Sequence, residues 1–160
     1  MKNNQKRRKH LYFILSAATM LVFIAAVLWV SNNRFNDPLN KYQEAYGYSL
    51  KDIDVHYIDR LYISNFQDPQ EEYVVSVDGN REGTLFDLND YHDGIDEESM
   101  NLINLIHKSI ISQDKEPLFK IDDNVSYKSR MIINTLDHED KMILVFNTEN
   151  EEYYIVVVHI

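Results

Sequence analysis

Residues 153–160 read Tyr-Tyr-Ile-Val-Val-Val-His-Ile, a run that is almost continuously apolar. Its β-branched and aromatic residues favour an extended strand. A strand that is apolar on both sides has to be covered on both of its faces, because an exposed one would pair with other chains and aggregate. We therefore predict that this run forms a central strand of a β-sheet.

The segments just before this run predict the rest of a β-meander. Residues 130–136 and 141–146 are rich in strand-forming residues, and the polar residues 137–140 between them suit a turn. Residues 117–121 form a further candidate strand. The last third of the chain is therefore expected to be largely β-structure.

The earlier part of the chain predicts two or three more antiparallel strands. Residues 52–63 and 73–77 alternate between apolar and polar side chains. Residues 78–83 contain two glycines and suit a hairpin loop, which would lead into a strand at residues 84–88.

Two segments have helical signals instead. Residues 96–113 place acidic side chains in the first turn and apolar ones at helical spacing. The spaced positions are Met100, Ile103, Ile106 or His107, and Ile110, with Leu102 and Leu105 widening the stripe. Residues 38–46 predict a shorter helix, since Asp37 can cap its start and Gly47 can stop it.

The predicted element order is α-β-β-β-α-β-β-β-β. A sheet with one apolar face needs a covering layer, and the longer helix is the natural one. The predicted fold class is therefore α+β, with an antiparallel curved sheet packed on one main helix.

A separate apolar segment precedes this domain. Residues 11–30 carry no charge, and as a helix they would extend about 30 Å, which matches the hydrocarbon core of a bilayer. Tyr12 and Trp29 lie near its two ends, where amphipathic rings prefer the interface. We predict a transmembrane signal-anchor helix; a cleaved signal peptide and a buried core helix are the alternatives.

Orientation follows from the basic residues in the first ten positions, which hold no acidic residue. These are Lys2, Lys6, Arg7, Arg8 and Lys9. The positive-inside rule keeps such a segment in the cytoplasm. The prediction is a single-pass protein of the cell membrane with a cytoplasmic tail (1–10), a tether (31–37) and an extracytoplasmic domain (38–160).

The domain after the apolar segment is strongly acidic. The chain has 16 Lys or Arg and 26 Asp or Glu; with the five basic residues of the tail removed, 11 face 26, a formal net charge of −15. This charge argues against nucleic acid and anionic lipid as outer partners. It favours basic peptides, cationic protein surfaces or divalent ions. Because the chain has no cysteine, disulfides and thiolate metal sites are excluded.

The acidic stretch at residues 87–98 raises the question of a calcium site. With Gly94 as the glycine of an EF-hand loop, the ligand positions fall on Asn89, Tyr91, Asp93 and Met100. Tyr91 and Met100 do not fit this pattern. The simpler interpretation is a solvated loop that caps the following helix, with a looser cation site left open.

No cofactor, metal site or catalytic residue is predicted. The histidines have no HxH or HxxxH spacing; they are His10, His56, His92, His107, His138 and His159. Neither GxSxG nor SxxK occurs, and Ser109 and Ser112 suit the surface of a helix. With 26 carboxylates in the chain, no particular acidic pair stands out.

These observations predict a non-enzymatic binding or accessory protein anchored in a bacterial cell envelope. Its expected partners are the bilayer, through residues 11–30, and a basic peptide or envelope protein. Tyrosines outside the anchor suit strand packing or, alternatively, a binding patch. Two other hypotheses stay open: a regulator that acts through its transmembrane helix on a transporter or sensor, and an envelope hydrolase.

Overall fold

The computed structural model describes residues 19–20, 22–24, 37–63 and 69–159. The chain divides into two compact units, residues 1–41 and residues 42–160.

In the first unit, residues 19–20 and 22–24 are helical and exposed. Among the residues that the structure describes, no helix has both the length and the apolar composition needed to cross a membrane. Most of the predicted anchor lies outside the described residues. The same holds for the predicted orienting and interfacial residues, namely Lys2, Lys6, Arg7, Arg8, Lys9, Tyr12 and Trp29.

The short helical segment predicted at residues 38–46 is confirmed. It consists of a 3-10 helix, η1 (Pro38–Tyr42), followed by α2 (Gln43–Tyr46). The carboxylate of Asp37 accepts the backbone N–H of Leu39 at 2.9 Å. Gly47 ends α2 in the left-handed region, at φ 65°, which glycine adopts without steric cost.

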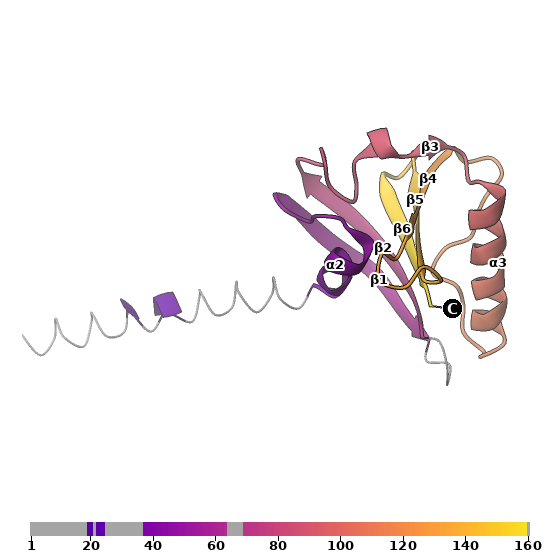
Figure 1. Ribbon diagram of the computed structural model, residues 1–160, viewed down its shortest axis with the longest axis horizontal. Helices are drawn as coiled ribbons and strands as arrows, with labels where there is room; N and C mark the ends of the chain where they lie inside the picture. Colours follow the sequence, from indigo (N-terminus) through magenta and orange to yellow (C-terminus); the bar gives the residue numbers. More distant parts are fainter. Residues whose placement is uncertain (1–18, 21, 25–36, 64–68, 160) are drawn as a thin grey trace, which may run out of the picture. The chain divides into compact units, whose positions relative to one another are not determined.

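The second unit is built on a six-stranded sheet in the order β1-β2-β6-β5-β4-β3, in which every neighbouring pair is antiparallel (Figure 1). The strands are β1 (Ile53–Ile63), β2 (Gln70–Gly79), β3 (His92–Asp93), β4 (Tyr127–Ile133), β5 (Lys141–Asn147) and β6 (Glu152–Val158). The predicted central strand is confirmed, since β6 pairs with β2 on one side and with β5 on the other. The antiparallel sheet of the predicted fold class is likewise observed.

Both faces of β6 are buried, as its apolar sequence requires. On one face, Val156 and Val158 belong to a core that also holds Ile103, Ile106 and Ile110 of the main helix, α3 (Glu97–Ile111). On the other face, Tyr153 contacts the ring of Phe86, with 4.8 Å between centroids. In Figure 1, α3 and α2 lie on opposite sides of the sheet. The domain is therefore a sheet covered by helical and irregular segments on both faces.

The strand predicted at residues 84–88 is wrong. The carboxylate of Asp87 accepts the backbone N–H groups of Gly83 and Asn89, at 2.8 and 3.0 Å, and the hydroxyl of Thr84 donates to the carbonyl of Arg81. Such local side-chain bonds satisfy the backbone in turns and compete with sheet pairing. The segment instead leads into η2 (Leu88–Asp90), and buried Phe86 covers the sheet without joining it.

Two further differences concern the sheet. Residues 117–121 were expected to form a strand but do not; the backbone N–H of Leu118 donates to the side chain of Glu72 at 2.9 Å instead. The two-residue strand β3 lies within the segment expected to be a loop. Both differences depend on a partner that is distant in sequence, Glu72 for residues 117–121 and β4 for β3. The local sequence pattern does not reveal such partners.

Candidate binding groove on helix α3

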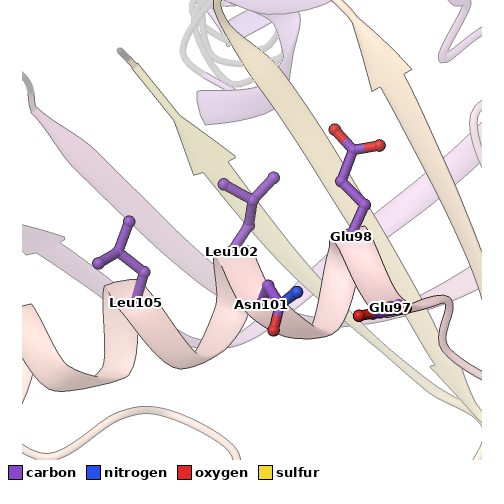
Figure 2. A pocket seen from close by; sticks show the side chains of 5 residues that line it. All are labelled: Glu97, Glu98, Asn101, Leu102 and Leu105. Carbon is purple, nitrogen blue, oxygen red and sulfur yellow. The ribbon is translucent and has the colours of Figure 1, made fainter.

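A shallow groove of about 580 Å³ runs along one side of α3. It is lined by Glu97, Glu98, Asn101, Leu102 and Leu105. Glu98, Leu102 and Leu105 project from the same side of the helix (Figure 2), as expected for residues spaced four and three apart. Leu105 is 61% exposed, so the groove has an apolar wall that is open to solvent.

One residue that lines the groove, Glu98, is paired with a residue of the sheet. Lys141, the first residue of β5, reaches across to Glu98 with 2.6 Å between the ammonium nitrogen and the carboxylate oxygen. Ile133 lies directly opposite Lys141 in the β4–β5 ladder, so the two side chains share one face of the sheet. Ile133 is nevertheless 51% exposed. Ile133 is therefore an exposed apolar side chain on the α3 face of the sheet, beside Lys141.

The groove contains one carboxylate that makes no ion pair with any described residue. Glu98 is paired with Lys141, and Asp93, just before the helix, is paired with Lys128 at 3.0 Å. Glu97 is exposed and makes no ion pair within the described part of the chain. A cationic group entering the groove would therefore find a free carboxylate at the start of α3.

Leu102 and Leu105 were predicted as part of the core-facing stripe of this helix. The prediction is wrong for Leu105. The core-facing side of α3 consists of Ile103, Ile106 and Ile110, whereas Leu105 is exposed to solvent. The signal was present in the sequence as an apolar stripe wider than one packed face requires. It did not show which edge of the stripe would remain uncovered.

The loop considered for calcium is held by bonds to its own backbone. Asp87 accepts two backbone N–H groups, which lower the pKa of its carboxyl group. Asp96 caps α3 by accepting the N–H of Ser99 at 2.8 Å. Burial opposes ionisation of Asp96, but the bonds from Ser99 outweigh it and lower the pKa. Among the described residues, no three His, Asp or Glu side chains converge as metal ligands. The cap that Asp96 makes agrees with the interpretation of a helix-capping loop.

One cluster brings together serine, histidine and aspartate, yet not in a catalytic arrangement. His92 Nε2 lies 3.0 Å from the hydroxyl of Ser129 and 3.3 Å from Asp96. A triad needs the two partners on opposite ring nitrogens. The buried hydroxyl of Ser129 already donates to the carbonyl of Gly94 at 2.7 Å. The cluster therefore fastens β3 and the start of α3 to β4.

A second histidine pairs with a carboxylate in the core. Glu72 is fully buried, and its Oε1 lies 3.3 Å from Nε2 of His107 on α3. The two atoms face each other without the geometry of a hydrogen bond, so the contact is mainly electrostatic. The ring of His107 also packs edge-on against Phe119, with 5.2 Å between centroids. The pair connects α3 to β2 beneath the protein surface.

Two further histidines, His56 and His159, pair with different acids. His159 Nδ1 lies 2.8 Å from Asp140, and this contact joins the end of β6 to the start of β5. His56 lies 3.2 Å from Asp78 on the exposed β1–β2 hairpin. His138 lies in the turn between β4 and β5, and His10 lies outside the described residues. The histidines are therefore dispersed rather than gathered into one site.

Several tyrosines serve in packing. Tyr73 is fully buried, and its hydroxyl donates to the buried carboxylate of Glu71. The hydroxyl of Tyr42 bonds to the same carboxylate, and burial together with that negative charge raises the pKa of Tyr42. Arg60 supplies the positive charge, 3.6 Å from Glu71. These residues form a polar cluster within the domain, in agreement with the packing interpretation.

Comparison with known proteins gives no match: no family model, no curated protein and no solved structure is similar to this chain. The function is therefore inferred from the chain's own surfaces, charge and sequence.

Proposed function

We propose that the chain is a membrane-anchored, extracytoplasmic binding or accessory protein of a bacterial cell envelope. Its binding surface is the groove on α3. The observation that carries this proposal is an apolar wall of two leucines, exposed Leu105 and partly buried Leu102, beside the carboxylate of Glu97, which makes no ion pair among the described residues. Apolar patches rimmed by polar groups are typical of protein interaction sites.

The charge of the domain supports a cationic partner. A formal net charge of −15 after the first ten residues would attract basic proteins and repel nucleic acid and anionic lipid. Within the groove, Glu97 would pair with a cation, while Leu102 and Leu105 would contact apolar side chains. We propose a basic, partly apolar protein surface as the ligand.

The histidine–carboxylate pairs of the domain do not contribute to the groove. The described histidine–carboxylate pairs lie at separate places, and each links structural elements rather than lining the groove. The groove itself offers two carboxylates, an amide and two leucines. Such a lining can bind a ligand through ionic and apolar contacts. We therefore propose a binding role that is not enzymatic.

The proposed location rests on the sequence. Residues 11–30 are long and apolar enough to span a bilayer, and the basic residues before them favour a cytoplasmic N-terminus. The groove would then face the outside of the cell, where it meets other envelope proteins or secreted peptides.

Site-specific photo-crosslinking in intact cells tests the binding role. A photoreactive amino acid at Leu105 is expected to give a discrete adduct with another protein. The same amino acid at Ile111 is the matched control, because both residues lie on α3 and both are 61% exposed. An adduct at position 105 and none at 111 is the predicted result. The absence of an adduct at 105, or equal adducts at both positions, would contradict the proposal.

A further inference from the structure

We infer that the groove on α3 receives a basic amphipathic helix of a partner protein, which lies antiparallel to α3. This inference rests on the proposed function, since it names the partner of that same site. The spacing of the lining residues indicates a helical partner, and the charges along α3 indicate its orientation.

The shape of the groove favours a helix. Glu98, Leu102 and Leu105 form a row along α3 that spans about 10 Å, or two turns. Rows spaced by three and four residues pack against similar rows on a second helix. The apolar stripe of a partner helix would thus lie along Leu102 and Leu105.

An extended strand is a poorer fit. A strand would have to pair with the outer edge of β4, where β3 already pairs with Ser129 and Lys128. Beyond this pairing, only the last residues of β4, 130–133, are left at this edge. Most strands in proteins have about five or six residues, so this edge is too short for a stable added strand.

The charge distribution along α3 sets the orientation. Glu97 and Glu98 lie in its first turn, whereas exposed Lys108 lies in its last turn. A partner helix that runs antiparallel brings its basic C-terminal half to Glu97 and keeps its cations away from Lys108. Antiparallel helix dipoles are also electrostatically favourable. A second copy of this chain would be opposed by the repulsion of two domains of high negative charge.

Binding of designed peptides to the full chain tests this inference. The chain is held in nanodiscs of zwitterionic lipid, which do not attract basic peptides by charge. The first probe is an 18-residue amphipathic helix with leucines on one face and lysines confined to its C-terminal half. The second probe has the same composition with the lysines in the N-terminal half. Fluorescence anisotropy is expected to show that the first binds roughly tenfold more tightly.

Two pairs of variants locate the site. Leu105→Ser should weaken the first peptide roughly tenfold, as for a truncated interface anchor, whereas the equally exposed Ile111→Ser should leave affinity unchanged. Glu97→Gln should weaken it several-fold and reduce its salt dependence. Glu149→Gln makes the same charge change at an exposed turn and should have little effect. Unchanged thermal unfolding of the Leu105→Ser variant excludes loss of the fold as the cause.

The outcomes separate this inference from the proposed function. Equal affinity for the two peptides, or equal effects of Leu105→Ser and Ile111→Ser, would overturn the basic-helix inference. If the cellular adduct at Leu105 forms while neither peptide binds, the groove has a different ligand and only this inference fails. An adduct with twice the mass of the chain would identify a second copy as the occupant, which also overturns it. If no adduct forms at Leu105, the proposed function itself fails.

Discussion

Replacing Tyr153 with alanine is expected to lower the free energy of unfolding by about 3–5 kcal/mol, the usual cost of removing a large aromatic side chain from a core. Tyr153 is fully buried on the central strand, and its ring contacts Phe86, Tyr91 and Phe146. Its hydroxyl donates to the carbonyl of Phe86 at 3.0 Å. Burial raises the pKa of this hydroxyl, which keeps it protonated as a donor.

Pulse proteolysis of the full chain across a urea series measures this effect, and two milder variants control it. Tyr153→Phe keeps the ring but leaves the Phe86 carbonyl without this donor, at an expected cost of about 1–3 kcal/mol. Tyr154→Phe is expected to change stability little, because the Tyr154 hydroxyl bonds to Asn150 in an exposed turn and its ring keeps the stack on Phe119. Equal losses for the two phenylalanine variants would contradict the assignment of the Tyr153 hydroxyl to a buried hydrogen bond and of the Tyr154 hydroxyl to an exposed one.

Replacing His107 with leucine is expected to lower the free energy of unfolding by about 3–5 kcal/mol, because it leaves the fully buried carboxyl group of Glu72 without the imidazole that lies 3.3 Å from it. Leucine has a similar volume, so little of this loss comes from a cavity. Among the described residues, Glu72 would then keep one hydrogen bond, from the backbone N–H of Leu118. One neutral donor does not offset the desolvation of a buried charge.

A double-mutant cycle identifies the charge as the cause of this loss. Glu72→Gln removes the charge and keeps an oxygen that can accept from Leu118. Combined with His107→Leu, it is expected to recover at least about 1 kcal/mol relative to His107→Leu alone, a coupling typical of residues in contact. Strictly additive effects in the same proteolysis assay would show that the two side chains do not interact.

The elements with continuous local signals were predictable from the sequence. The central position of β6 follows from its apolar run, and α3 follows from its acidic first turn and the spacing of Ile103, Ile106 and Ile110. Gly47 ended the short helical segment where expected. In each case one short stretch of chain contains both the residues that favour the helix or strand and the residues that end it. Such an element can be predicted without knowledge of a distant contact.

Elements that depend on distant partners were not predictable. Leu85 and Phe86 have a strand-like pattern, but the turn made by Asp87 directs them onto the sheet face instead. Residues 117–121 are likewise diverted by Glu72, 46 positions away from Leu118. For the groove, the sequence contained the apolar stripe but not its exposed edge, which depends on where α3 crosses the sheet.

Cysteine labelling on intact cells tests the central claim, that an anchored domain carries the groove outside the membrane. The chain has no cysteine, so single replacements at Asp123, which is exposed, and at Asn3 give unambiguous probes. A membrane-impermeant maleimide is predicted to label the Asp123→Cys chain at once and the Asn3→Cys chain only after permeabilisation, with both chains staying in the membrane fraction after an alkaline wash. Labelling in the opposite order, or release of the chain into the soluble fraction, would contradict the account.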